Sequence, residues 1–81
     1  MLSELRKKID DIDDIIIKSL EERYKIIESI KLVKKENNLS ILDNKREEEI
    51  FKKIIDKKLD HQKDIINIYQ LILKLSKDNQ E

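Results

Sequence analysis

Residues 2–33 read LSELRKKIDDIDDIIIKSLEERYKIIESIKLV, and the spacing of their apolar side chains decides the fold. When the stretch is divided into heptads from Leu2, eight of the ten a and d positions are apolar, and Arg23 and Ser19 are the two exceptions. This period is typical of a long helix whose apolar seam packs against another helix. It predicts a helix over about 4–36, with Ser3 as its N-cap and the Asn37-Asn38 pair supplying a left-handed C-cap.

Two shorter helices are expected after a polar loop at residues 37–42. Asp43 can cap a helix over about 44–58, whose apolar stripe is Ile50, Phe51, Ile54 and Ile55. A break at residues 59–62, with Asp60 as the expected cap, precedes a third helix over about 61–79. Its inward side chains are expected to be Ile65, Ile68, Tyr69, Ile72 and Leu75. The fold class is therefore all-α, with one long and two shorter helices in each chain.

Composition excludes several classes of protein. The chain has 81 residues, with 18 Lys and Arg, 18 Asp and Glu, and no Gly, Pro, Cys or Trp. This length allows one domain, and the lack of cysteine excludes disulfides and thiolate metal sites. Zero net charge argues against nucleic acid and membrane surfaces as partners. Neither a membrane-spanning apolar run nor a signal-like start is found, so a cytoplasmic location is expected.

The length of the first helix predicts that the chain does not act alone. At 1.5 Å per residue, a helix of about 33 residues is about 50 Å long. A compact globule of 81 residues is only about 30 Å across. Because the seam is apolar almost to both ends, the projecting part needs a partner. We expect a homodimer in which the long helices pack together and the chains are intertwined.

The polar side chains that interrupt or flank the apolar stripes are the candidates for a binding site. Arg23 lies at an a position, and Lys34 follows eleven residues later, about 16 Å along the axis and near the same face. Together they can bind the two ends of one small anion. The alternatives are an ion pair or register-setting role for Arg23 and an ordinary exposed Lys34. Arg6 is about 25 Å from Arg23 along the helix, so it can reach that site only from a partner chain whose long helix pairs antiparallel with this one; otherwise Arg6 is a surface charge near the first turn.

The two shorter helices contribute further polar candidates. Asp43, Arg46 and Glu47 share one face of the second helix, and Ser76 and Gln80 extend the inward stripe of the third. A solvated first turn and a fraying polar C-terminus are the simpler interpretations. His61 is the only histidine, so a structural role is expected and a transition-metal site is not.

In combination, these residues resemble the all-helical class of chorismate mutases. The resemblance extends over nearly the whole chain. It rests on Leu5-Arg6-x-x-Ile9-Asp10-x-Ile12-Asp13, Leu20-x-Glu22-Arg23, Lys34 eleven residues later, Ile41-x-Asp43-x-x-Arg46-Glu47, and Ser76-x-x-x-Gln80. It implies an intertwined all-α dimer with two active sites, which rearranges chorismate to prephenate without a metal or organic cofactor.

The resemblance also implies a role for each candidate residue. Arg23 and Arg6 of the partner subunit would hold the substrate carboxylates, and Lys34 and Gln80 would donate to the ether oxygen. Glu47 would accept from the ring hydroxyl, beside the backbone of Asp43. Ser76 would bind the ring carboxylate, and Arg46 would support the carboxylate network. We expect a stand-alone form of the enzyme, because the length leaves no room for a regulatory domain. Feedback control would then come from a partner chain, such as another shikimate-pathway enzyme.

Two other functions remain open at this stage. An isochorismate-pyruvate lyase resembles the same class in fold and binds a similar dianion. A non-catalytic helical dimerisation module would use Arg23 only to set the register. The module leaves the joint spacing of Arg23, Lys34, Glu47 and Gln80 unexplained, whereas the lyase does not.

Overall fold

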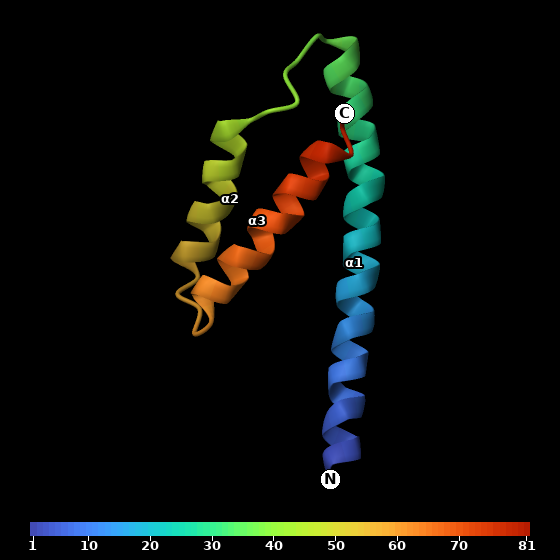
Figure 1. The fold of residues 1–81 in the computed structure, drawn as a ribbon, viewed down its shortest axis with the longest axis vertical. Coiled ribbons are helices and arrows are strands. Elements are labelled where there is room, and N and C mark those ends of the chain that lie inside the picture. Colours follow the sequence, from blue (N-terminus) through green and yellow to red (C-terminus); the bar gives the residue numbers. More distant parts are fainter.

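A computed structural model describes all 81 residues and contains three helices and no strands. The helices are α1 (Leu2–Glu36), α2 (Asn44–Asp56) and α3 (Gln62–Asp78). Helices α2 and α3 pack against each other, and α3 returns diagonally so that its C-terminal end meets α1 (Figure 1). The prediction of an all-helical chain with one long and two shorter helices is confirmed. None of the three helices is long and apolar enough to cross a bilayer.

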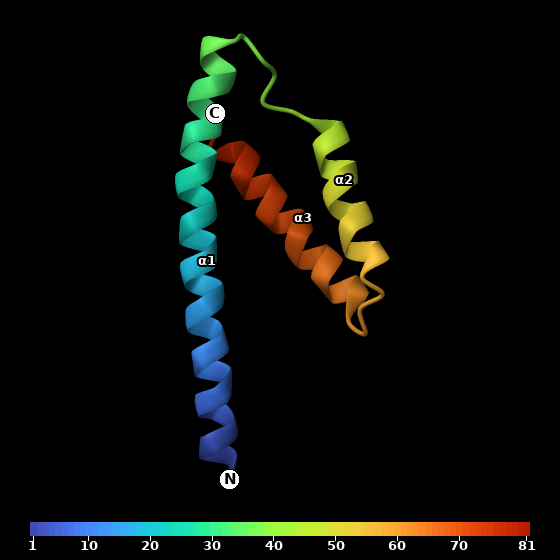
Figure 2. The same cartoon turned by 180° about the vertical axis from the view of Figure 1, so that it is seen from behind.

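Helix α1 extends well beyond the rest of the chain. Its 35 residues correspond to about 52 Å, and the longest dimension of the molecule is 55 Å. The radius of gyration is 15.7 Å, whereas a compact chain of this length has about 12 Å. In both views the N-terminal half of α1 stands apart from α2 and α3 (Figures 1 and 2). No residue of α1 is buried, and the seam residues Ile9 and Ile16 are 57% and 50% exposed.

The C-terminus of α1 is closed by a pair of asparagines. Asn37 is the C-cap, and Asn38 adopts a left-handed conformation with φ of 53°. The Leu39 N–H donates to the Lys34 carbonyl at 2.8 Å, and the Asn38 N–H donates to the Lys35 carbonyl at 3.4 Å. These two bonds are those of a Schellman motif, in which glycine usually holds the left-handed position. The expected left-handed cap at the Asn37-Asn38 pair is therefore confirmed.

Helix α2 begins where the sequence predicts and ends two residues earlier than expected. The carboxylate of Asp43 accepts from the Arg46 N–H at 3.0 Å, as expected for an N-cap. The helix ends at Asp56 because Lys58 takes a left-handed conformation, with φ of 52°. The expected range of 44–58 counted this residue as helical.

Two of the predicted caps are wrong. Helix α1 begins at Leu2, so Ser3 lies inside its first turn and Met1 is the N-cap, without a side-chain bond. The Leu5 N–H donates to the Met1 carbonyl, so the helix starts two residues before the expected one. In α3 the N-cap is His61 rather than Asp60, because the His61 carbonyl accepts the first helical bond, from the Ile65 N–H.

The packed faces of α2 and α3 differ in part from the predicted stripes. Ile54 of α2 and Leu73 of α3 are the two buried apolar residues. Three residues expected to point inward are exposed instead: Ile55 (49%), Ile68 (54%) and Leu75 (37%). Ile68 is exposed because α3 meets α1 only near its C-terminal end, and Ile55 and Leu75 lie on helix faces that the rest of the chain leaves partly uncovered. The inward line of α3 therefore turns towards Leu73 and two buried polar residues, Ser76 and Gln80.

The left-handed lysine at the end of α2 predicts a stabilising substitution. A residue with a Cβ atom costs about 1–2 kcal/mol in this conformation, and glycine avoids that cost. We expect Lys58→Gly to raise the free energy of unfolding by about 0.5–1 kcal/mol and Tm by about 2–8 °C, after the entropy lost by glycine is subtracted. Lys57→Gly is the matched control, because Lys57 is helical with φ of −73°. Thermal melts should show a gain at 58 and a loss at 57; equal changes would contradict this interpretation.

Candidate active site

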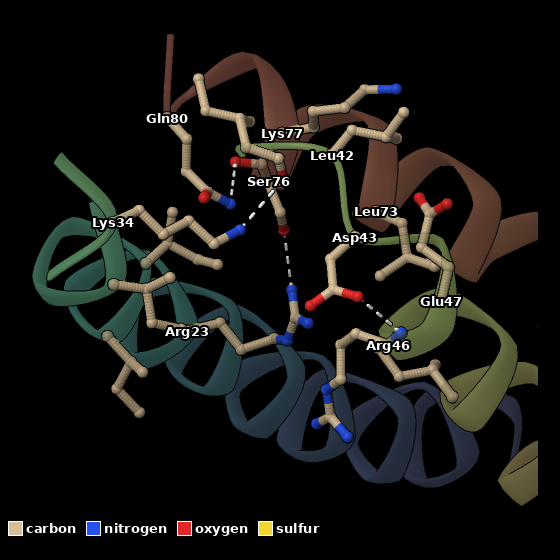
Figure 3. Close-up of a pocket in the computed structure, with 15 residues that line it drawn as sticks. Arg23, Lys34, Leu42, Asp43, Arg46, Glu47, Leu73, Ser76, Lys77 and Gln80 are labelled. Atoms are coloured by element: carbon tan, nitrogen blue, oxygen red, sulfur yellow. Dashed lines mark hydrogen bonds between the residues drawn. The ribbon is translucent and has the colours of Figure 1, made fainter. Parts of the chain in front are cut away.

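The candidate site is a pocket of about 470 Å³ between the C-terminal half of α1, the loop that follows it, α2 and α3. All three helices contribute to its walls (Figure 3). Its lining residues are Arg23, Ile26, Ile27, Ile30, Lys34, Ile41, Leu42, Asp43, Arg46, Glu47, Ile50, Leu73, Ser76, Lys77 and Gln80. Seven of the eight candidate residues from the sequence are in this set. The pocket thus combines seven apolar side chains with charged and polar groups that can orient a ligand, as small-molecule sites usually do.

Arg23 joins two helices that are far apart in sequence. Its side chain is half-buried, and Nη1 donates to the Ser76 hydroxyl oxygen at 3.0 Å. Arg23 takes part in none of the three ion pairs of the chain, so the structural ion pair considered from the sequence is absent. A guanidinium has five N–H groups, and one is used here. The others remain available for an anion in the pocket.

Lys34 lies in the last turn of α1 and faces the same pocket. Its ammonium donates to the Ile41 carbonyl at 3.0 Å, across the loop. The backbone carbonyl of Lys34 accepts from Leu39, so this residue binds the loop through both its main chain and its side chain. An ammonium has three N–H donors, so two remain for a ligand. Lys34 is thus held in position rather than freely solvated, which contradicts the simpler interpretation of an ordinary exposed lysine.

Ser76 and Gln80 are the two buried polar residues, at 6% and 9% exposure. The Ser76 hydroxyl donates to the Ile72 carbonyl at 2.8 Å and accepts from Arg23. The Gln80 amide nitrogen donates to the Ser76 carbonyl at 3.2 Å, which leaves one N–H free. Gln80 Oε1 is buried without a hydrogen-bond partner. A carboxamide in this state is expected to complete its hydrogen bonds with a ligand or water in the pocket.

Asp43, Arg46 and Glu47 form the α2 side of the pocket (Figure 3). Asp43 caps the helix, and Arg46 pairs with Glu49 at 3.3 Å near the surface. The carboxylate of Glu47 is half-buried and makes no ion pair or side-chain hydrogen bond. Glu47 is therefore the acidic group that is free to accept a hydrogen bond from a ligand.

One predicted residue lies outside the pocket, and two contributors were missed. Arg6 is on the projecting half of α1 and does not line the cavity. Lys77 does line it, although the i to i+4 stripe of Ser76 and Gln80 skips this position. The Ile41 carbonyl was missed because a backbone group carries no signal in the residue types.

The arrangement suits noncovalent binding of a small anion. Two cations and a carboxamide with free donors face an apolar space, with one acidic acceptor opposite them. No group of three or more His, Asp and Glu side chains is placed to hold a metal ion. Such a site can bind a carboxylate compound and stabilise negative charge that develops within it.

Comparison with known proteins agrees with this geometry. A stretch of 54 residues is 48% identical to the bifunctional chorismate mutase/prephenate dehydratase of Aquifex aeolicus, and covers 67% of this chain and 15% of that protein. Over 79 residues the chain is 33% identical to the chorismate mutase of Methanocaldococcus jannaschii, covering 94% of this chain and 80% of that one. No solved structure matches the chain significantly.

The family match spans almost the entire chain. Residues 5–81 correspond to the family described as chorismate mutase type II, which includes every residue that lines the pocket. The match also includes the projecting N-terminal half of α1, apart from its first three residues. The chain therefore belongs to the type II chorismate mutase family.

Proposed function

We propose that the chain catalyses the rearrangement of chorismate to prephenate, on the route to phenylalanine and tyrosine. One observation carries the proposal: Arg23 and Lys34 of α1 and the buried, incompletely bonded Gln80, which follows the end of α3, converge on one pocket. The reaction is an intramolecular pericyclic step, so the protein has to supply neither a nucleophile nor an electron carrier. It has to hold a dianion in its compact, reactive conformer.

Binding of the two carboxylates is assigned to cations and hydroxyls. Arg23 offers its remaining N–H groups to one carboxylate, and its bond to Ser76 fixes the guanidinium before the substrate arrives. Ser76 is assigned to the ring carboxylate, to which it can donate only when its hydroxyl turns away from the Ile72 carbonyl, and Arg6 of the partner subunit supplies a further guanidinium. Because these groups are ordered in advance, less entropy is lost on binding.

Stabilisation of the transition state is assigned to Lys34 and Gln80. As the C–O bond breaks, negative charge develops on the ether oxygen. The free N–H groups of the Lys34 ammonium and of the Gln80 carboxamide are the donors proposed for this oxygen. Lys34 would also contact a carboxylate. Donors that strengthen as charge develops lower the barrier, because they bind the transition state better than the substrate.

The α2 side of the pocket is assigned to the ring hydroxyl. The unpaired Glu47 carboxylate accepts from this hydroxyl, and the backbone of Asp43 lies at the same end. Arg46 supports the carboxylate network from the rim, where it can move between Glu49 and the substrate. Orientation of the ring by these groups would select the reactive conformer.

We further propose that the working form is an intertwined homodimer. The seam of α1 has no partner within the chain, and Leu5, Ile12 and Ile26 are 53%, 52% and 61% exposed. A contiguous apolar surface of this kind marks a protein interface. Pairing the α1 helices would bury the seam and bring Arg6 of each chain to the pocket of the other. Since chorismate is a soluble metabolite, the cytoplasm is the location we expect, and any regulatory partner would be another shikimate-pathway enzyme.

An assay on the purified chain tests the proposed reaction. We expect chorismate to be consumed and prephenate to appear in equal amounts, as followed by chromatography of the reaction mixture. Incubation with isochorismate separates the main alternative, because a lyase would release salicylate and pyruvate. A chain that consumes neither compound and binds no transition-state analogue would be a helical dimerisation module instead.

A further inference from the structure

Lys77 adds to the pocket a cation that has no role in the proposed reaction. It lies in the last turn of α3, directly after Ser76 and three residues before Gln80, and it is half-buried. Figure 3 shows its side chain at the rim beside Leu42, with the ammonium directed away from Arg23 and Lys34. The position suggests a contact with the entering ligand rather than with the reacting atoms.

The charge of Lys77 is not neutralised by a neighbouring acid. The three ion pairs of the chain are Arg46–Glu49, His61–Asp64 and Lys74–Asp78, and Lys77 belongs to none of them. The adjacent Asp78 is bound by Lys74 at 2.9 Å. This hydrogen bond and the charge of Asp78 raise the pKa of Lys74 above its ordinary value. Lys77 is therefore a basic side chain at the pocket rim with no acidic side chain bound to it.

Lys77 contributes a large share of the net positive charge that the pocket lining offers to a dianion. Four cations (Arg23, Lys34, Arg46 and Lys77) and two acids (Asp43 and Glu47) line the pocket, a difference of plus two. Without Lys77 the difference is plus one. The whole chain has a net charge of zero, so attraction of an anion has to come from the local field rather than from the protein as a whole.

We propose that Lys77 is a capture residue that draws dicarboxylate substrates into the pocket and sets its preference for dianions over monoanions. The proposal rests on the proposed chorismate mutase function. A rim cation acts on encounter and binding and contributes equally to ground and transition states. It therefore changes KM and kcat/KM but leaves kcat almost unaltered. Its effect should also weaken as salt screens the field.

The test compares four substitutions at two lysines on the same helix. At low ionic strength, Lys77→Gln should lower kcat/KM for chorismate about threefold to tenfold through KM, and Lys77→Glu should lower it further. Lys77→Arg should restore wild-type kinetics. Lys63→Gln is the control with the same change in net charge, because Lys63 is exposed on the same helix, forms no ion pair and does not line the pocket, and it should remain within about twofold of wild type. At high salt the difference between Lys77→Gln and wild type should shrink.

Several results would overturn the capture role while leaving the mutase function intact. They are equal kinetics of Lys77→Gln and Lys63→Gln, a fall in kcat without a change in KM, and a loss that salt does not reduce. Circular dichroism melts show whether each variant folds. If Lys77→Gln does not fold, the kinetics of Lys77→Arg and Lys77→Glu are compared with each other instead. Failure of wild-type protein to convert chorismate would overturn the proposed function itself, and the capture role with it.

Discussion

Lys34→Ala is expected to lower kcat by about a hundredfold or more while leaving the protein helical. Removal of one fixed donor to a developing oxyanion typically has an effect of this size, about 2.7–4 kcal/mol in the barrier. The structural loss is smaller, because the side chain makes one hydrogen bond, to the Ile41 carbonyl. That bond contributes about 1 kcal/mol to stability. Steady-state kinetics with chorismate, together with far-UV circular dichroism, measures the two effects separately.

Lys35→Ala is the matched control for this substitution. Lys35 is the next residue of the same helical turn, is exposed, and does not line the pocket. Its replacement removes the same charge from the chain, so kcat should stay within about twofold of wild type. A Lys34→Ala enzyme that keeps more than about a tenth of the wild-type kcat would remove Lys34 from the proposed mechanism.

Mixing two inactive variants is expected to restore activity if the site is shared between subunits. An Arg6→Ala chain and an Arg23→Ala chain should each be nearly inactive as homodimers. After joint unfolding and refolding, random pairing makes about half of the dimers mixed, and each mixed dimer has one intact site out of two. The mixture should therefore recover about a quarter of the wild-type activity per chain.

A second mixture distinguishes a shared site from nonspecific rescue. Arg23 and Lys34 lie on the same pocket wall of one chain, so an Arg23→Ala chain mixed with a Lys34→Ala chain cannot form an intact site. This mixture should remain as inactive as its components. Absence of recovery in the first mixture, with heterodimers demonstrated by mass spectrometry, would show that Arg6 does not act across the interface.

The sequence predicts the parts of the fold and pocket that depend on helical period. Arg23 and Lys34 are eleven residues apart, which is close to three full turns, so any helix through this stretch places them on one side. Ser76 and Gln80 follow from the same rule on α3. The bond between Arg23 and Ser76 could not be predicted in this way, because it depends on the angle at which α3 meets α1.

The sequence-based predictions fail where backbone conformation or the angle between helices decides the structure, because residue types carry little information about either. Ile68 continues an apolar stripe, but α3 approaches α1 only near its C-terminal end, so Ile68 remains exposed in the chain. Lys58 is a good helix former and still ends α2, since its backbone is left-handed. Lys77 was missed because the stripe pattern gives weight to spacings of three and four, whereas a pocket wall also includes the residues beside the stripe.

The exposed seam of α1 has a consequence for the kinetics of folding. The longest helix buries no residue, so a single chain gains little free energy from packing it. We therefore expect the structure to be completed only when two chains associate. If two chains associate through α1 as proposed, formation of the native state should be second order, with a half-time that shortens as protein concentration rises. Dilution would not merely separate finished subunits. It would also unfold them. The active site would therefore last only as long as the dimer itself.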